Sequence, residues 1–456
     1  MATRDYIFYE LTNSVCSQCL NKLEAKIIIQ QGNVYLLKNC PTHGKEKVLI
    51  STDVDYYKKC RGFNKPSDLP KQFNTPIKQG CPYDCGLCPD HEQHSCIILI
   101  EVTERCNLTC PTCYAASSPS HGRHRTLAEI ETMLDVAVAN EGVPDVIQIS
   151  GGEPTIHPEF FEILDLAKQK PIQHLMLNTN GVRIAQDRAF VERLASYKPA
   201  FEIYLQFDSF EPKAWQSLRG IDLSETKAQA IAHLNEFNLS TTLVVTLQKG
   251  LNTHEIGKII DFATQQKCVR GVTFQPTQIA GRVDHFDPKT DTITLSEVRT
   301  AILEQTDLFL PADLIPVPCH PVAIAMGYAL KLGDEMVPLT RFFDPEELLS
   351  LSSANTIRFE HLPEIKQKIH NLFSTSCSTE AAPEELKSLM CCLPKIDVPE
   401  LKYDNLFRVI IMQFYDAYNM DIRGVKKSCV HIVHEDGRMI PFDTMNLFYR
   451  NNLINN

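Results

Sequence analysis

Short apolar runs alternate with amphipathic stretches through the middle of the chain. The runs are rich in β-branched and aromatic residues and predict strands at 97–102, 146–149, 174–178, 201–207, 242–247 and 272–274. Between them, apolar residues recur at helical spacing over 127–139, 224–237 and 254–266. Thr126 followed by Glu129 is a typical helix start. This alternation predicts an α/β fold with a parallel sheet, and six such units form a partial (β/α)6 barrel.

Three segments of the chain differ in character. Residues 1–96 contain eight of the 17 cysteines and show little periodicity, which predicts a small metal-binding domain. Residues 97–290 hold the predicted barrel, and residues 291–456 form a C-terminal α+β region with further cysteines. The longest apolar run, at 322–330, is a buried helix or strand rather than a span, because crossing a bilayer takes ~20 residues. We therefore expect a soluble, cytoplasmic protein with no transmembrane segment.

Composition indicates metal binding and gives no sign of nucleic-acid binding. Seventeen cysteines in a chain with no secretory signal point to metal binding rather than to disulfides. The net charge of −11 provides no basic surface for a polyphosphate backbone, so no nucleic-acid partner is expected.

A compact cysteine motif directly follows the first predicted strand. Cys106, Cys110 and Cys113 have CxxxCxxC spacing, which supplies three thiolates but no fourth ligand. Three thiolates can hold three irons of a 4Fe–4S cluster and leave the fourth iron open to a small molecule. The alternative is a zinc site completed from elsewhere in the chain.

Other chemically suggestive residues follow the next three predicted strands. The sequence SGGEPT at 150–155 follows the second strand, and its adjacent glycines allow a ligand to approach the backbone closely. Asn178, Thr179 and Asn180 end the third strand, and Asp208 and Ser209 follow the fourth. The carboxyl ends of barrel strands meet on one face, so these residues are expected to converge. A turn that only ends the strand is the alternative for the second position, and solvated turns are the alternative for the third and fourth.

The cysteine motif and the GGEP motif together resemble the radical S-adenosylmethionine (SAM) superfamily. The resemblance implies that Cys106, Cys110 and Cys113 carry a 4Fe–4S cluster that reductively cleaves SAM to a 5′-deoxyadenosyl radical. It implies a low-potential electron donor of the flavodoxin or ferredoxin type. It also implies that SAM is bound by a set of strand-end residues: Gly151, Gly152, Glu153, Pro154, Thr179, Asn180, Asp208 and Ser209.

A second CxxxCxxC motif precedes the barrel. Cys81, Cys85 and Cys88 predict an auxiliary 4Fe–4S cluster, with Cys96 or a distant cysteine as the fourth ligand. A zinc site is the alternative. In the C-terminal region, the cysteines can furnish another auxiliary cluster or be buried structural thiols: Cys319, Cys391, Cys392 and Cys429.

The N-terminal cysteines predict a mononuclear site. Cys16 and Cys19 form one CxxC knuckle, and Cys40 with His43 forms the second, around a predicted hairpin over 27–37. Cys60 competes with His43 for the fourth position. Iron and zinc both suit such a site, and its expected role is to stabilise a small fold.

Several further motifs resemble a narrower group that contains archaeal tetraether lipid synthases and pterin dimethyltransferases. They are the doubled CxxxCxxC, PVPCHP at 316–321 and DGRMIPF at 436–442. The resemblance implies hydrogen abstraction from an unactivated carbon and C–C bond formation, on a lipid chain or a pterin-type small molecule. Asp443 stands where the group has a cysteine, which puts one auxiliary-cluster ligand in doubt. The alternatives are a peptide- or cofactor-maturing radical SAM enzyme and a non-catalytic iron–sulfur scaffold.

Overall fold

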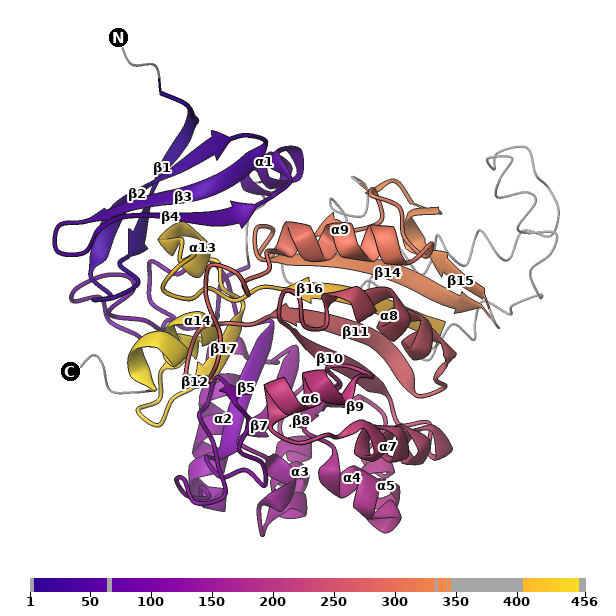
Figure 1. Cartoon of the computed structure of the whole chain (residues 1–456). Coiled ribbons are helices and arrows are strands. Elements are labelled where there is room, and N and C mark those ends of the chain that lie inside the picture. Colours follow the sequence, from indigo (N-terminus) through magenta and orange to yellow (C-terminus); the bar gives the residue numbers. More distant parts are fainter. Residues whose placement is uncertain (1–3, 64–67, 333–334, 342, 346–404, 451–456) are drawn as a thin grey trace, which may run out of the picture.

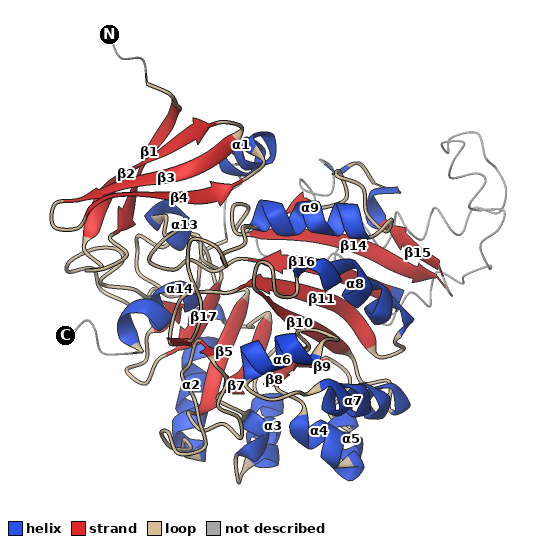
Figure 2. Ribbon diagram, viewed as in Figure 1, coloured by secondary structure: helices blue, strands red, loops and turns tan. Residues whose placement is uncertain are grey.

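The computed structural model describes residues 4–63, 68–332, 335–341, 343–345 and 405–450. Its main feature is a twelve-stranded mixed sheet with helices packed on one face, and a separate four-stranded sheet lies at the N-terminal end (Figures 1 and 2). No helix in these ranges is both long enough and apolar enough to cross a membrane.

Six parallel strands form the centre of the large sheet, in the order of their sequence. They are β5 (Ile97–Thr103), β7 (Val146–Gly151), β8 (His174–Thr179), β9 (Phe201–Gln206), β10 (Thr241–Leu247) and β11 (Val269–Pro276). All six strands predicted from the apolar runs are confirmed. The order of pairing confirms the partial (β/α)6 barrel, and the sheet does not close within the described residues.

The helices between these strands cover the outer face of the sheet (Figure 2). They are α2 (Leu127–Glu141), α3 (Phe160–Gln169), α4 (Val182–Gln186), α5 (Arg188–Ala195), α6 (Pro212–Arg219), α7 (Ser224–Glu236) and α8 (Ile256–Gln265). Thr126 and Glu129 form the expected capping box at the start of α2. The helices predicted over 127–139, 224–237 and 254–266 are confirmed as α2, α7 and α8.

Side chains alternate between the two faces of each strand. In β7, Ile147 and Ile149 pack into the core beneath the helices, whereas Gln148 faces the barrel interior. In β9, Ile203 and Leu205 are likewise buried under helices. The interior face is therefore free to carry polar residues without disturbing the main core.

C-terminal strands extend both edges of the six-stranded centre. β16 (Leu406–Met412) pairs in parallel with β11, and β17 (Val430–Val433) pairs in parallel with β5 (Figure 1). The predicted apolar run at 322–330 lies in a strand, β14 (Ile324–Leu332). The other elements of this region are α9 (Leu295–Gln305), β13 (Ile315–Pro316), β15 (Glu335–Pro338), α13 (Ile422–Val425), β18 (Met439–Pro441) and α14 (Phe442–Thr444).

An antiparallel sheet forms the N-terminal end. Its strands are β1 (Ile7–Val15), β2 (Lys22–Gln30), β3 (Asn33–Cys40) and β4 (Gly44–Ser51), followed by α1 (Val54–Gly62). The predicted hairpin is β2–β3. The small sheet contacts the C-terminal region through Lys38, whose ammonium donates to the carbonyls of Ala417 and Tyr418 at 2.9 Å each. The chain divisions at residues 96 and 290 stay predictions.

Candidate functional site

An arginine that follows β11, the last of the six central strands, fixes the cysteine loop after β5. Arg282 in β12 (Arg282–Val283) pairs with Cys113 in β6 (Thr112–Cys113). Its guanidinium donates to the carbonyls of Cys110 at 2.5 Å and Ser117 at 2.8 Å. These contacts fix the backbone of the loop that carries the three thiols.

The three thiols suit a metal cluster. Cys106 and Cys110 are buried and Cys113 is half-buried, and the three act on one another electrostatically. Burial raises the pKa of Cys106 to about 12. Cys106 therefore stays protonated at neutral pH unless a metal replaces the proton, so it is poorly suited to act as a free thiolate nucleophile. Three thiols on one loop are a donor set that a metal cluster can use.

The glycine turn after β7 packs directly on the start of the cysteine loop. The Gly152 N–H donates to the Thr103 carbonyl at 2.8 Å, and the Glu153 N–H donates to the Arg105 carbonyl at 2.9 Å. A Cβ atom at Gly151 or Gly152 would lie 2.2 Å from one of these carbonyl oxygens. Only glycine fits at these two positions.

Glu153 ties the glycine turn to the end of β8. Its buried carboxylate accepts hydrogen bonds from the Thr155 hydroxyl at 2.5 Å, the Thr179 hydroxyl at 2.7 Å and the Asn180 N–H at 2.8 Å. Burial raises its pKa. Pro154 is buried at the start of the next turn. Direct contact of Glu153 with SAM stays a prediction.

The end of β8 reaches the cysteine loop. The Asn180 side-chain amide donates to the Asn107 oxygen at 2.7 Å and lies 3.9 Å from the Cys106 sulfur. The buried Lys227 on α7 donates to the Asn180 carbonyl, and burial lowers the pKa of this lysine to about 7. The structure thus brings together the first three predicted strand-end motifs.

The side chains of Asp208 and Ser209 bond to other residues of the protein. Arg219 at the end of α6 forms a bidentate ion pair with Asp208, at 2.6 and 2.9 Å, and both side chains are buried. The Ser209 hydroxyl donates to Glu255. Neither predicted residue lines the cavity described next, so their contact with SAM stays a prediction.

A cavity that is partly open to solvent lies inside the barrel. At one end it is lined by residues from the cysteine loop, the glycine turn and the end of β8, together with Arg219 of α6: Cys113, Gly151, Gly152, Thr179 and Asn180. Arg219 and Lys227 were missed by sequence reasoning. Each lies on a helix whose amphipathic pattern gives no sign that its charged residue turns inward.

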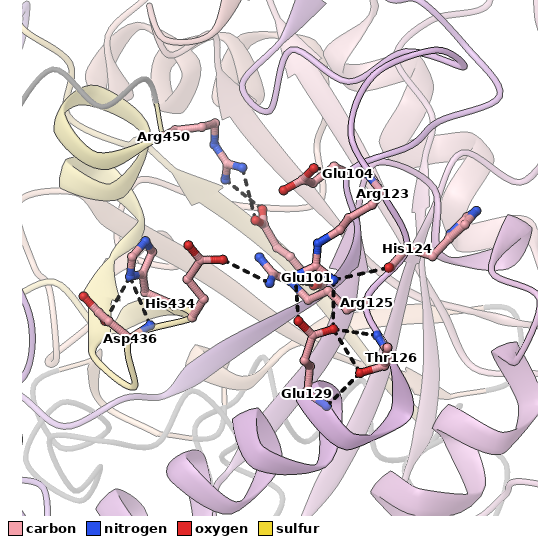
Figure 3. A network of polar contacts seen from close by, with 11 residues as sticks. Glu101, Glu104, Arg123, His124, Arg125, Thr126, Glu129, His434, Asp436 and Arg450 are labelled. Carbon is pink, nitrogen blue, oxygen red and sulfur yellow. Dashed lines mark hydrogen bonds and ion pairs between the residues drawn. The ribbon is translucent and has the colours of Figure 1, made fainter.

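The segment that follows the cysteine loop is held by ion pairs (Figure 3). Arg450 forms a bidentate pair with Glu101 of β5, at 2.7 and 3.1 Å, and lies over the Tyr114 ring. Arg123 pairs with Glu129 at 2.6 Å, which links the segment to α2. Tyr114 directly follows Cys113, so this network limits movement of the loop.

The N-terminal knuckles form a compact four-ligand group. His43 Nδ1 lies 3.4 Å from the Cys16 sulfur and 3.5 Å from the Cys40 sulfur, and the Cys19 and Cys40 sulfurs are 3.9 Å apart. Ligands about 2.3 Å from a tetrahedral ion lie roughly 3.8 Å apart, so the group fits a single ion. Backbone N–H groups of residues 42 and 43 lower the pKa of Cys40 to about 6. Cys60 lies on α1 outside this group.

The second CxxxCxxC motif lines a cavity of its own. Cys81, Cys85 and Cys88 line one small cavity, together with Asp90 and His91. Cys96, considered above as their fourth ligand, is not among the lining residues.

Cys96 instead joins two distant cysteines, because the starts of β5 and β17 lie side by side. Its sulfur and those of Cys319 and Cys429 all lie within 4.8 Å of one another, and Cys319 and Cys429 are 3.5 Å apart. His94 Nε2 is 3.6 Å from the Cys96 sulfur. Cys391 and Cys392 fall outside the described residues.

Asp443, on α14, is buried against the segment that joins β16 to β17. It accepts hydrogen bonds from the Tyr415 N–H at 2.5 Å and the Ser428 hydroxyl at 2.9 Å. Burial raises its pKa to about 6. Its carboxylate is thus paired within the protein.

Comparison with known proteins identifies the class. Residues 100–263 match the model of the radical SAM superfamily, and residues 8–52 match the HMPTM N-terminal zinc ribbon domain. The protein is a radical SAM enzyme.

Its particular family follows from a full-length relative. The chain is 31% identical to the 7,8-dihydro-6-hydroxymethylpterin dimethyltransferase of Methanocaldococcus jannaschii, over 96% of this chain and 94% of that protein. It belongs to the same family. The GTP 3′,8-cyclase of Haemophilus ducreyi is also 31% identical, over 34% of this chain and 44% of its own. Streptococcus suis SuiB bound to S-adenosylmethionine aligns with a TM-score of 0.36 and 19% identity, over 42% of this chain and 43% of that one.

Proposed function

We propose that this enzyme reductively cleaves SAM, abstracts a hydrogen atom from an unactivated carbon and joins that carbon to a ring carbon of a pterin. The observation that carries the proposal is the meeting of the three-cysteine loop and the glycine turn at one end of a single cavity. The full-length resemblance to a pterin dimethyltransferase supports transfer of a one-carbon group rather than coupling of lipid chains.

The proposed reaction balances in electrons and atoms. SAM takes up one electron and gives methionine and the 5′-deoxyadenosyl radical. This radical takes a hydrogen atom from the carbon donor and becomes 5′-deoxyadenosine, and the donor radical adds to the acceptor ring. Loss of one proton and one electron completes the C–C coupled product, in which the carrier of the one-carbon group is still attached. Reductive cleavage of the bond between the carrier and the transferred carbon, with two electrons and two protons, then gives the methylated ring and the free carrier. A protein of the flavodoxin or ferredoxin type is the proposed partner that supplies these electrons and recovers the one released.

A 4Fe–4S cluster on Cys106, Cys110 and Cys113, when bound, supplies the low-potential electron that cleaves SAM. The chain's own residues prepare the site around it. Gly151 and Gly152 leave room beside the backbone. Arg219 places a positive charge near the Cys110 thiol, whose pKa it lowers against the larger raising effect of burial. This charge stabilises the thiolates that a cluster needs.

The test compares cysteine variants of anaerobically reconstituted protein given dithionite and SAM. Wild type should form 5′-deoxyadenosine, and the variant with alanine at positions 106, 110 and 113 should form none. Cys268→Ala is the matched control, because Cys268 is buried in the main core away from all proposed metal centres. Wild-type rates in the triple variant would overturn the assignment. Mass spectrometry with a pterin and a candidate carbon donor then tests for an alkylated pterin.

Two further metal centres are part of the proposal. We assign an auxiliary cluster to Cys81, Cys85 and Cys88, which surround one small cavity. We assign another centre to Cys96, Cys319 and Cys429 with His94. Glu141 accepts a hydrogen bond from His94 Nδ1 at 3.1 Å, which leaves Nε2 free to bind a metal beside Cys96.

A further inference from the structure

The cavity beside the second CxxxCxxC motif is lined by more possible metal ligands than its three cysteines. A 4Fe–4S cluster has four irons that can each take a protein ligand, and Cys81, Cys85 and Cys88 supply three ligands. Asp443 is not among the described residues that line this cavity. Three other lining side chains are of types that bind metals: Asp84, Asp90 and His91. The bonds that these three already make decide which of them can complete the cluster.

The two carboxylates are already paired. Asp84 Oδ2 accepts hydrogen bonds from the backbone N–H groups of three consecutive residues, Lys78 at 2.6 Å, Gly80 at 2.7 Å and the residue between them. The Asp90 carboxylate forms an ion pair with the Lys426 ammonium at 2.8 Å. A metal would have to compete with these partners for either carboxylate. Neither aspartate is therefore the favoured fourth ligand.

The His91 ring is held in the orientation that a metal ligand needs. Its Nε2 lies 2.9 Å from the carbonyl oxygen of Ser428. Because a carbonyl oxygen only accepts a hydrogen bond, Nε2 carries the proton and Nδ1 carries the lone pair. No hydrogen bond joins Nδ1 to any residue in the described part of the chain. Histidine ligands in metal sites usually donate their other ring N–H to a carbonyl or carboxylate in this way.

A second histidine supports this orientation. His431 Nε2 lies 3.2 Å from His91 Nε2, and His431 Nδ1 lies 2.9 Å from the Ser95 hydroxyl. Since His91 Nε2 carries the proton, His431 Nε2 shares this N–H with the Ser428 carbonyl as a second acceptor. The two rings meet edge to face, with their centroids 5.0 Å apart. These contacts leave Nδ1 as the ring nitrogen of His91 that is available to a metal.

His91 also lies next to the cysteines and is neutral. Its backbone N–H donates to the Cys88 carbonyl at 2.9 Å, which keeps the residue beside the motif. Its side chain is buried, and burial lowers the pKa of His91 to about 4. The ring is therefore neutral at pH 7 and does not have to lose a proton before it binds a metal.

We propose that His91 Nδ1 is the fourth ligand of the cluster that the second CxxxCxxC motif holds. This rests on the proposed function, which assigns a 4Fe–4S cluster to that motif. With four protein ligands this cluster has no open iron for SAM, unlike the cluster on the loop after β5. A neutral imidazole in place of a thiolate also makes the cluster less negative, which raises its reduction potential. Such a centre is suited to take up the electron that is released after the coupling step.

The experiment looks for the histidine nitrogen in the pulsed EPR spectrum of the reduced cluster. Full-length protein that contains isotope-labelled histidine is reconstituted anaerobically with iron and sulfide and reduced with dithionite. Wild type should show a coupling to the labelled nitrogen. His91→Cys should lose this coupling, keep its iron and shift the midpoint potential of the cluster to more negative values, because a thiolate adds negative charge. His91→Ala should lose the coupling as well.

Two other histidine variants are the controls. His94 lies beside Cys96 in the other cysteine group, so a coupling that remains in His94→Ala does not come from that group. We expect the His91 coupling to remain there. His254→Ala, whose side chain is 57% exposed, should behave as wild type. The circular dichroism spectrum shows that each variant is folded.

The ligand assignment is overturned by a coupling that persists in both His91 variants. It is also overturned if His94→Ala shows no coupling although the loss of iron in Cys85→Ala proves that the cluster is present. Unchanged iron in Cys85→Ala would rule out the cluster and its histidine ligand together. Failure of the SAM chemistry has a different result: wild type then forms no 5′-deoxyadenosine, whereas the coupling and its loss in His91→Cys are still measurable.

Discussion

Arg219 shows how a single side chain sets the charge balance beside the cysteine loop. Its guanidinium is buried, pairs with Asp208 and also donates to the Thr246 hydroxyl at 2.9 Å. Removing it leaves the Asp208 carboxylate buried without its counter-ion. The loss of folding stability should be large, because an unpaired buried charge costs far more free energy than a lost surface ion pair.

We predict that Arg219→Ala lowers the free energy of unfolding by about 3–5 kcal/mol. The matched control is Arg188→Ala, which breaks the exposed pair with Glu236 and should cost no more than about 1 kcal/mol. Urea denaturation at pH 7 of both variants checks this. Equal losses would show that the Asp208 pair contributes no more than a surface contact.

Gly152 gives a second prediction at this scale. In Gly152→Ala the new methyl group would lie 2.2 Å from the Arg105 carbonyl oxygen, so the turn must move away from the cysteine loop. We expect SAM affinity to fall at least about tenfold, on the premise that the turn then misplaces the SAM-binding backbone. Isothermal titration of SAM into reconstituted protein measures this. Gly62→Ala is the matched control, because Gly62, like Gly152, has no positive φ and no atom lies within 4 Å of the added methyl group.

At the scale of elements, a buried polar network joins three strands beneath the cavity. Glu202 of β9 pairs with His174 of β8 at 3.2 Å and with Arg408 of β16 at 3.4 Å. Burial alone would raise the pKa of Glu202, but the Arg408 charge and the His174 hydrogen bond hold it well below its usual range. The network thereby links a C-terminal strand to the central sheet.

We predict that Glu202→Gln destabilises the fold by about 3 kcal/mol at pH 7, because Arg408 then stays buried without its carboxylate. A carboxyl group whose pKa is lower in the folded than in the unfolded state stabilises the fold at pH values above its unfolded pKa, about 4.3. This stabilisation is lost as the pH falls further. The difference in the free energy of unfolding between wild type and variant should therefore become smaller below about pH 4. Urea denaturation at pH 7 and at pH 3.5 measures it, with Glu236→Gln as the exposed control. A gap that does not change with pH would contradict the ionised state assigned to Glu202.

At the scale of the whole molecule, the proposed metal centres lie in separate parts of the chain. One three-cysteine loop opens into the barrel cavity, and the group of Cys96, Cys319 and Cys429 lies where β17 pairs with β5. The four-ligand group of Cys16, Cys19, Cys40 and His43 belongs to the N-terminal sheet. We therefore expect the SAM chemistry in the barrel, and centres that stabilise the fold or carry electrons in the segments around it.

We predict that anaerobically reconstituted protein holds clearly more than about four irons per chain, because one 4Fe–4S cluster cannot occupy both CxxxCxxC motifs. Elemental analysis with Mössbauer spectroscopy measures this. Cys16→Ala with Cys40→Ala should remove one mononuclear ion and leave the cluster iron unchanged. A total of about four irons, with zinc at the other cysteines, would rule out the auxiliary clusters.

Cys85→Ala separates the roles of the two CxxxCxxC loops. We expect this variant to keep SAM cleavage, because its thiol lines a cavity apart from the barrel, yet to lose most of the coupled product. Quantifying 5′-deoxyadenosine and alkylated pterin in the same reaction gives both readouts. Wild-type product formation would show that the Cys81, Cys85 and Cys88 site is structural.

The sequence by itself determined the six central strands, the capped helix α2 and the family. These features are local: alternation, caps and cysteine spacing are complete within windows of a few to about fifteen residues. For the same reason the N-terminal knuckles were recognisable, since each holds two ligands close together in the chain.

Only the tertiary structure decided which distant residues meet. Cys319 and Cys429 are 110 residues apart in sequence, and they join Cys96 because β17 pairs beside β5. The pairing of Arg219 with Asp208 and the inward face of Gln148 likewise depend on helix packing and strand register. Strand pairing over long separations depends on which faces can be buried together, and no local pattern contains that information.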